Sequence, residues 1–180
     1  GIPGNYAIPN TVTNIGDWSF RGCLNLTRIV IPGSVSSIGN SAFEDCIAVT
    51  NLTIPNGILN IGEFAFDHCV LLTSALIPAS VTYFGPAAFE QCGHLNSLTV
   101  DVNNVNYMSS NGVIFTKDGS TLVECASGKV GSYTIPDSVT RIGDYAFASS
   151  YLTNVTIPDS VINIGGDAFW VSALNRSEEK

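Results

Sequence analysis

Charged side chains are scarce in this chain of 180 residues, and basic ones are the scarcest. Asp, Glu, Lys and Arg make up 12% of the residues, about half of the roughly 25% that is usual in soluble domains. Seven basic residues stand against 15 acidic ones, which gives a formal net charge of −8 at pH 7. Clustered Lys and Arg bind nucleic acids and anionic membranes. Because no such cluster occurs here, we expect neither partner.

Long apolar runs are also missing. No stretch approaches the roughly 18 consecutive apolar residues of a membrane-spanning helix, so we expect no membrane insertion. Hydrophobic residues nevertheless make up 45% of the chain. This share is enough for the core of one globular domain.

Residue types that hold metals or carry catalysis are few and poorly spaced for either role. The chain has two histidines and five cysteines, without the Cys-x-x-Cys or paired-His spacing of a zinc site. His94 follows Cys92 by two residues, but a nucleophile–base pair also needs a third, orienting group. His68 occupies a position that varies between repeats, as exposed residues do. We therefore predict no enzyme, no catalytic residue, no metal and no cofactor.

Residues 101–106 are the remaining candidate for a metal site, because Asp101, Asn103, Asn104 and Asn106 faintly resemble a calcium-binding loop. The segment lacks the bidentate Glu and the invariant Gly of such a loop. Asn and Asp favour turns by bonding to their own backbone. We therefore interpret the segment as a turn.

A repeat of 23 residues dominates the sequence: the first four Ile-Pro pairs are 23 residues apart, and the last two are 22 apart. Four markers share one register: an Ile-Pro pair, an Ile-Gly or Phe-Gly pair seven residues later, a phenylalanine and a cysteine. Several markers in one register indicate a repeat architecture. The Ile-Pro pairs begin at Ile8, Ile31, Ile54, Ile77, Ile135 and Ile157, the phenylalanines are Phe20, Phe43, Phe66, Phe89, Phe147 and Phe169, and the cysteines are Cys23, Cys46, Cys69 and Cys92.

Each repeat predicts two short strands and a turn. Residues 26–31 end in an alternation of apolar and polar side chains, as in a half-buried strand, and the following proline ends that strand. Val35 and Ile38 predict a second, inward-facing edge, and the glycine after them permits a bend closed to residues with a Cβ. Residues 41–46 suit one helical or 3₁₀ turn that packs Phe43 inward. One unit cannot bury its apolar face, whereas stacked units can.

The period breaks once. Pro78 and Pro136 belong to successive Ile-Pro pairs but lie more than two periods apart, which predicts one further coil with an insertion over about residues 101–133. Residues 95–100 read as a good strand, although Asp101 stands where proline is expected.

The insertion carries a hairpin signal. Asp118-Gly119 separates the apolar runs 113–115 and 121–123, and an Asp-Gly between two such runs is typical of a β-hairpin. We therefore predict a hairpin on the fifth coil, after which residues 133–135 resume the stack.

These motifs resemble the BspA-like, or Treponema-type, leucine-rich repeat family. The likeness is carried by the unit Leu-x-x-Val-x-Ile-Pro, Ser-Val-x-x-Ile-Gly and Ala-Phe-x-x-Cys over about residues 5–172, and the inserted segment resembles a variant coil of that family. The resemblance implies a repeat solenoid of about seven coils as a single domain over residues 1–180. It also implies a parallel β-sheet on the concave face and short strands with 3₁₀ or helical turns on the convex face. Members are secreted or cell-surface proteins, often adhesins, without shared catalytic residues.

Alternation along the long strands predicts which side chains point out of the sheet. We expect eight side chains to face inward, namely Ile29, Ile31, Leu52, Ile54, Leu98, Val100, Val155 and Ile157. The alternate residues would form a surface of hydroxyls and amides, and solenoids use such concave sheets to bind partners. The alternative is the simple β-propensity of Thr and Val on a solvated face. The predicted binding surface consists of Arg28, Val30, Asn51, Thr53, Ser74, Leu76, Ser97, Thr99, Ser132, Thr134, Asn154 and Thr156.

The four cysteines of the repeat should stack as a ladder of small buried groups. Inert thiols are favoured, because Ser150 and Ser172 take this position in the last coils and Cys125 makes the number of cysteines odd. Adjacent rungs would lie about 5 Å apart, which leaves a disulfide between neighbours as the alternative.

The two ends of the solenoid differ. Repeat arrays need polar caps at their ends, and residues 170–180 resemble one, because Trp170 could serve as a lid before a polar tail. The start at residues 4–6 shows no such device. We therefore predict either a fragment of a longer array or end-to-end self-association.

Together these features favour a secreted or cell-surface module that binds a protein or glycan through the concave sheet or the inserted hairpin. The alternative is a structural spacer or assembly unit of a longer surface protein, with no ligand of its own.

Overall fold

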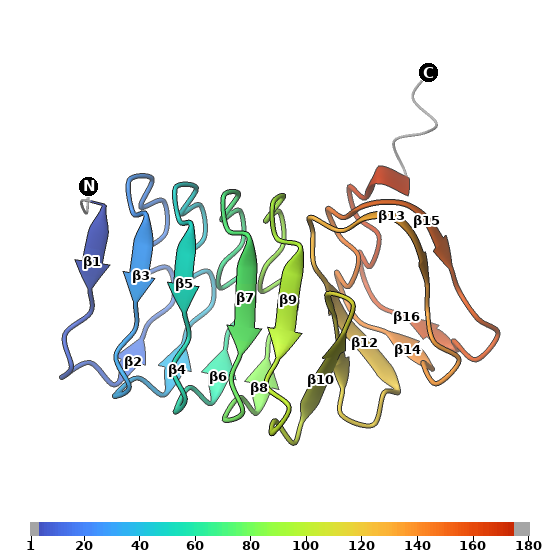
Figure 1. Cartoon of the computed structure of the whole chain (residues 1–180), viewed down its shortest axis with the longest axis horizontal. Coiled ribbons are helices and arrows are strands. Elements are labelled where there is room, and N and C mark those ends of the chain that lie inside the picture. The colour runs from blue at the N-terminus through green and yellow to red at the C-terminus, as the bar shows by residue number, and fades with distance from the viewer. Residues whose placement is uncertain (1–3, 175–180) are drawn as a thin grey trace.

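The chain forms a β-solenoid of about seven turns, in which successive coils stack along one axis (Figure 1). The computed structural model describes residues 4–174. The regular elements among the described residues are strands, apart from a short 3₁₀ segment at residues 173–174, and no helix among them is long and apolar enough to cross a membrane. The predicted repeat solenoid of the leucine-rich type is confirmed.

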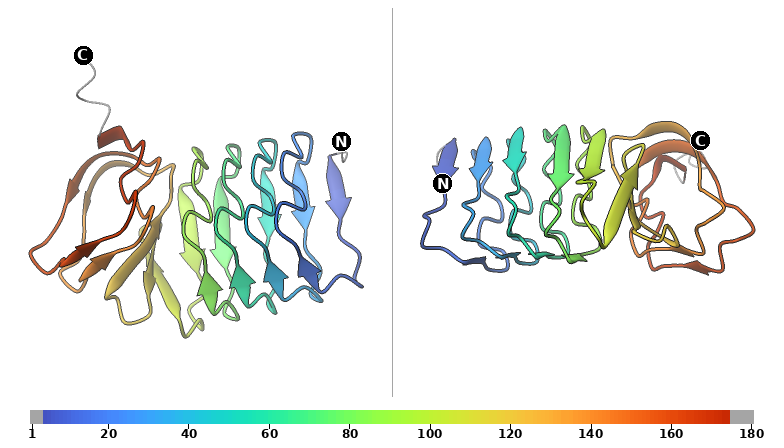
Figure 2. Two further views of the ribbon diagram at one scale, coloured as in Figure 1. Left: turned by 180° about the vertical axis from the view of Figure 1, so that it is seen from behind. Right: turned by 60° about the horizontal axis from the view of Figure 1, so that its bottom comes forward.

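One wall of the solenoid is built from the longer strands, which end near the prolines of the Ile-Pro pairs. They pair in parallel as three separate sheets, β1-β3-β5, β7-β9 and β13-β15 (Figure 2). Their register follows the repeat, so that Ile29 lies opposite Leu52. The strands are β1 (Asn5–Ala7), β3 (Arg28–Val30), β5 (Asn51–Thr53), β7 (Ser74–Ile77), β9 (Ser97–Val100), β13 (Val130–Thr134) and β15 (Tyr151–Thr156).

A second wall consists of strands of two residues each. The second residue of each strand is an isoleucine or phenylalanine, and it is buried in all of them except the last. The predicted second inward-facing edge is therefore present. These strands are β2 (Asn14–Ile15), β4 (Ser37–Ile38), β6 (Asn60–Ile61), β8 (Tyr83–Phe84), β14 (Arg141–Ile142) and β16 (Asn163–Ile164).

The glycines that follow β4, β6, β8 and β16 are required by the closeness of the coils. A Cβ on Gly39 would lie 2.6 Å from the backbone nitrogen of Asp17, and one on Gly62 would lie 2.6 Å from that of Asn40. Neither glycine has a positive φ. The reason for glycine is thus the approach of the preceding coil, and not the backbone bend that the sequence analysis inferred.

The expected helical or 3₁₀ turn takes the form of consecutive hydrogen-bonded turns. Glu44 N–H donates to the carbonyl of Ser41 at 3.2 Å and Cys46 N–H to that of Phe43 at 3.3 Å, as in a 3₁₀ helix. Ser41 and Asp45 have φ values of 52° and 60°, and such left-handed residues end a right-handed helix. Each regular turn instead bonds to the next coil, for example from Phe43 N–H to the carbonyl of Ala65 at 2.8 Å.

The variant coil contains the predicted hairpin and a second one. Strands β11 (Val113–Thr116) and β12 (Thr121–Cys125) pair antiparallel around Asp118-Gly119, which confirms the first. Strand β10 (Tyr107–Ser110) also pairs antiparallel with β11. Between them Asn111 and Gly112 have φ values of 51° and 76°, which suits a tight hairpin turn. Strand β12 then pairs in parallel with β14, so the wall of short strands continues as β10-β11-β12-β14-β16 (Figure 1).

The core lies between the walls, and stacked phenylalanine rings form its most regular part. Phe43 and Phe66 are fully buried, with ring centroids 5.3 Å apart and planes 1° from parallel. The prediction that this position is core is confirmed in the interior coils, whereas Phe20 and Phe169 at the ends are only half-buried. Strand β11 separates two clusters of buried side chains, because Ile114 packs in one and Val113 in the other.

One inward prediction is wrong. Ile157 is 40% exposed, because its coil is the last that the structure describes and no further described coil covers it. The other seven predicted inward residues are buried or half-buried.

Candidate functional site

The twelve side chains predicted to form a binding surface are all exposed on the wall of long strands. Parallel pairing arranges them in rows across the strands. Arg28 lies beside Asn51, and Val30 beside Thr53, at equivalent positions of β3 and β5. The same alternation places Leu76 beside Thr99 on β7 and β9. The sheet therefore offers flat rows of polar side chains with two apolar residues, Val30 and Leu76, between them.

The polar groups of this surface are largely free to bind a partner. Among its side chains, only Thr99 makes a hydrogen bond to another described residue, from Oγ1 to the carbonyl of Ala75 at 3.4 Å. Amides such as Asn51 and hydroxyls such as Thr53 can each donate and accept. The surface can thus recognise a partner by hydrogen bonds, but it holds no acid–base pair within the described chain.

The twelve residues do not lie on one continuous sheet. Ladder pairing stops between β5 and β7, and the variant coil separates β9 from β13 (Figure 1). Ser132 and Thr134 lie beside Asn154 and Thr156 on the last sheet, apart from the other eight. Sequence reasoning missed Val130 and Tyr151, which lie beside each other at the start of this sheet and are 71% and 44% exposed. Val130 lies at the end of the insertion and Tyr151 in the coil after it, where the repeat register is interrupted.

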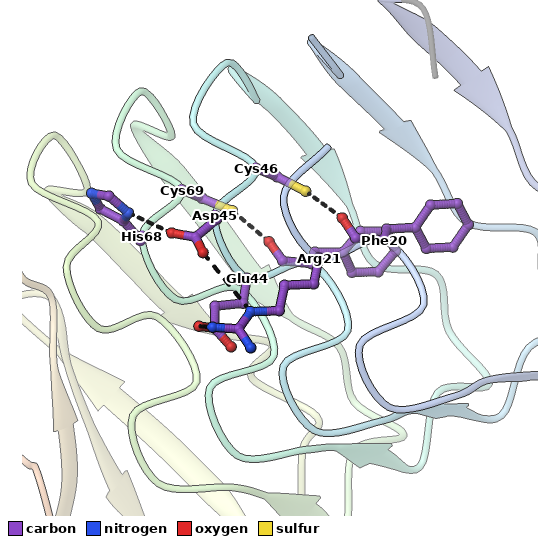
Figure 3. A network of polar contacts seen from close by, with 8 residues as sticks. Phe20, Arg21, Glu44, Asp45, Cys46, His68 and Cys69 are labelled. Atoms are coloured by element: carbon purple, nitrogen blue, oxygen red, sulfur yellow. Dashed lines mark hydrogen bonds and ion pairs between the residues drawn. The ribbon is translucent and has the colours of Figure 1, made fainter. Parts of the chain in front are cut away.

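The cysteines form the expected ladder of thiols. All five are free, so the alternative of a disulfide between neighbours is wrong. Cys46 and Cys69 donate to the carbonyls of Phe20 and Phe43 in the preceding coils, with Sγ–O distances of 3.2 and 3.4 Å (Figure 3). Burial raises the pKa of Cys46 to about 12, which makes this thiol unreactive.

The histidines do not join a nucleophile. His94 is exposed, with Nδ1 2.7 Å from the carbonyl of Val70. Cys92 is buried and donates to the carbonyl of Phe66 at 3.2 Å. The surface imidazole that the sequence analysis favoured for His94 is therefore confirmed.

An Arg–Glu ion pair and a His–Asp hydrogen bond cross the turns of the first three coils. Arg21 Nη2 lies 2.7 Å from Glu44 Oε1, and Asp45 Oδ1 lies 2.8 Å from His68 Nδ1 (Figure 3). His68 is thus half-buried against the neighbouring turn, although its position was predicted to be exposed. Because these side chains remain partly solvated, each pair contributes at most about 1 kcal/mol.

The segment from Asp101 to Asn106 is a turn, as the sequence analysis favoured. Asn104 is fully buried, and its Nδ2 donates to the carbonyls of Pro78 and Val81 at 2.9 and 3.0 Å. Its Oδ1 accepts hydrogen bonds from the N–H groups of Asn106 and Tyr107. Asn104 therefore anchors the start of the variant coil, and its oxygen is already used.

Sequence reasoning also missed a pocket on the turns. A cavity of about 510 Å³ opens beside the variant coil, with Glu44, Asp67 and Glu90 in its lining. These residues share one repeat position in three successive coils. A column of three carboxylates was therefore visible in the sequence, but the sequence did not show that a cavity opens beside them.

The repeats match one known family over most of the chain. The model of the BspA type leucine rich repeat region matches residues 4–115 and 124–178, in six copies. The chain belongs to the BspA-type leucine-rich repeat family. The family model leaves out residues 116–123, which hold the tip of the β11–β12 hairpin. A comparison with the curated proteins finds no match.

The solved structures that this chain resembles include three bacterial proteins. A leucine-rich repeat protein from Eubacterium ventriosum is 26% identical, with a TM-score of 0.76, over 91% of this chain and 50% of its own. The pneumococcal vaccine antigen PcpA is 28% identical, with a TM-score of 0.80, over 87% of this chain and 40% of its own. A leucine rich cell surface protein from Faecalibacterium prausnitzii is 28% identical, with a TM-score of 0.57, over 91% of this chain and 57% of its own. The chain thus spans about half the length of the solved proteins it resembles.

Proposed function

We propose that this BspA-type repeat domain acts at the bacterial cell surface or outside the cell, where it binds a protein or glycan. The observation that carries the proposal is the row of exposed polar side chains on the long strands, which make almost no hydrogen bonds to other described residues. A face of this kind offers donors and acceptors in a rigid, repeating array, which is how solenoids bind extended partners. The resemblance to a cell surface protein and to a vaccine antigen supports the proposed location.

An array screen followed by two matched variants tests this proposal. The chain is screened against immobilised glycans and host-cell surface proteins, and binders are measured with Asn51→Arg and Asn60→Arg. Both asparagines are exposed, in strands of the same coil, but Asn51 lies on the wall of long strands and Asn60 on the wall of short strands. We expect Asn51→Arg to weaken binding at least tenfold and Asn60→Arg to leave it unchanged. Equal affinities for both variants and the wild type would rule out the long-strand face.

The inserted hairpin is the second part of the proposed surface. Lys117 is exposed at its tip, beside the Asp118-Gly119 turn. A Lys117→Glu variant measured in the same assay separates the two surfaces. Loss of binding in this variant alone would place the partner on the hairpin.

A structural spacer is the second candidate function. It is favoured by the observation that the chain spans 50%, 40% and 57% of the length of three solved relatives. A spacer needs rigid stacking but no ligand. Absence of any binder in the screen, together with retained binding by a longer protein that contains this domain, would favour it.

A further inference from the structure

The variant coil interrupts the row of turns that runs along the solenoid. Regular turns bond to the next coil through pairs such as Phe66 N–H and the carbonyl of Ala88, at 2.8 Å. The variant coil has strand β12 where this turn would lie. Its Glu124 supplies the acceptor that Phe89 N–H would otherwise lack, through Oε1 at 2.8 Å, and its Oε2 also accepts from Ala88 N–H at 3.1 Å. The omitted turn leaves a gap in the row, and the pocket of about 510 Å³ opens there.

Carboxylates line this pocket without a basic residue among them. Glu44, Asp67 and Glu90 come from three successive turns and Asp167 from the last. Arg21 pairs with Glu44 at the far end of the column, and Ser149 Oγ donates to Glu90 Oε1 at 3.0 Å. Asp67, in the middle, pairs with no basic side chain and no hydroxyl among the described residues, and its Oδ1 has no hydrogen-bond partner there.

Asp67 is the clearest sign that something is missing from the pocket. Its side chain lines the cavity, the residue is only 8% exposed, and its Oδ1 has no hydrogen-bond partner. A buried carboxyl oxygen without a partner is costly and rare in folded proteins. Burial first, and the charges of Glu90 and Glu44 second, raise the pKa of Asp67 to about 7, although nearby His68 lowers it. A positive group in the pocket would offset the burial and the neighbouring charges that raise the pKa of the Asp67 carboxyl.

Aromatic rings form the other side of the pocket. Phe64, Ala87 and Tyr145 occupy the same repeat position in three successive regular coils. The rings of Phe64 and Tyr145 meet edge to face, with ring centroids 5.4 Å apart. They can meet because the intervening residue is a small alanine and the variant coil has no residue there. Trp170, which is 48% exposed, completes this side. Aromatic faces beside carboxylates are the usual means of holding an organic cation.

We propose that this pocket binds an organic cation, an ammonium or guanidinium group on a short chain, between the carboxyls of Asp67 and Glu90 and the rings of Phe64, Tyr145 and Trp170. The site is separate from the long-strand surface and does not depend on the function proposed there. The sequence analysis expected Trp170 to cap the end of the solenoid, and it did not predict that this side chain would line a pocket.

The chemistry of the lining selects this class of ligand over others. A cavity of about 510 Å³ has the size of a small-molecule site and is far larger than a bare ion. No group of three His, Cys, Asp or Glu side chains within residues 4–174 is arranged to hold a metal ion. An anion would be repelled by the carboxylates, and a neutral ligand would leave Asp67 without a counter-charge.

Titration calorimetry and tryptophan fluorescence on the whole chain test the proposal. The probes are spermidine, N-acetyl-lysine methylamide and its neutral isostere N-acetyl-norleucine methylamide. Trp170 should report binding, and a Trp18→Phe background removes the other tryptophan, which is exposed on the first turn and does not line the pocket. Asp67→Asn is the test variant, because it keeps the shape and removes the charge. Asp137→Asn, at an exposed position outside the pocket, is the matched control.

We expect at least one amine to bind at a single site with a sub-millimolar Kd, and the norleucine derivative not to bind. Asp67→Asn should weaken amine binding at least tenfold while Asp137→Asn leaves it unchanged. Binding should also strengthen from pH 6 to pH 8, as Asp67 loses its proton in the presence of Glu44, Glu90, Glu124 and His68. Spermidine binding alone would indicate a free amine as the ligand, whereas binding of the lysine derivative would indicate a protein side chain.

Three results would overturn the proposal: no binding of either amine, equal binding of the norleucine derivative, or unchanged affinity in Asp67→Asn. A thermal melt shows whether Asp67→Asn is folded. Spermidine should raise the Tm of the wild type but not that of a folded Asp67→Asn protein.

Discussion

The stack of phenylalanine rings predicts a large and local loss of stability when one ring is removed. Phe66 is fully buried between Phe43 and Phe89, with ring centroids 5.3 and 5.0 Å away. Truncating a buried phenylalanine to alanine costs about 3–5 kcal/mol through lost burial and the cavity left behind. Two ring contacts, each worth about 0.5–1.5 kcal/mol, disappear together. Stacked coils held by backbone hydrogen bonds cannot collapse into the space, so we expect Phe66→Ala to cost about 4–5 kcal/mol.

Urea unfolding followed by circular dichroism measures this loss, and the same turn offers a control. Phe64 is only half-buried and lines the pocket. Phe64→Ala removes the same number of atoms two residues away, and it should cost less than half as much. A loss below about 1 kcal/mol for Phe66→Ala, or equal losses for the two variants, would refute the view that the ring stack holds the coils together.

Three further predictions follow from the described contacts. Cys69→Ser should change the free energy of unfolding by less than about 1 kcal/mol, because a serine hydroxyl can donate to the carbonyl of Phe43 as the thiol does; a Tm that falls when reductant is added to the wild type would contradict the free thiols. Burial raises the pKa of Asp67 from 3.8 to about 7 and that of Glu124 from 4.5 to about 8, so the folded state holds these protons more tightly than the unfolded state does. Unfolding experiments from pH 4 to pH 8 should therefore show a free energy of unfolding that falls as the pH rises. The fall should be less steep in Asp67→Asn. Ile162 and Ile164 are 86% and 51% exposed on the last described coil, so we expect the 180-residue chain to self-associate through this coil. Light scattering should show the self-association, and Ile162→Lys should weaken it. A monomer at all concentrations would contradict this prediction.

The periodic part of the fold was predictable because each coil meets a copy of itself. A position that recurs in every regular coil has the same neighbours throughout the interior of the stack, so the burial of Phe43 implies the burial of Phe66. The rule fails at the ends, which is why Ile157 is exposed although the equivalent Ile31 is buried. The twelve residues of the long-strand surface were predictable by the same alternation, and all are exposed.

The variant coil was only half predictable. Asp118-Gly119 indicated one hairpin, and Asn111-Gly112 carried an equally strong signal for the other, but its first strand, Tyr107–Ser110, has a single apolar–polar alternation. The break in the wall of long strands between β9 and β13 depends on where the insertion places its strands, whereas the break between β5 and β7 lies between regular coils. No local pattern encodes that placement.

The pocket lay beyond sequence reasoning because it is made by something that one coil omits. In a regular array the turn of every coil covers the turn before it, whereas no regular turn follows that of Glu90, which is nevertheless buried. The variant coil replaces its turn with strand β12, and the Glu124 carboxylate accepts from the N–H groups of Phe89 and Ala88 without restoring the bulk of the turn. Side chains of turns on both sides then line one space, which brings Asp67 and Glu90 within reach of Tyr145 and Trp170. An irregular coil thereby creates a concave, charged site on the wall where a regular repeat would present only a ridge of turns.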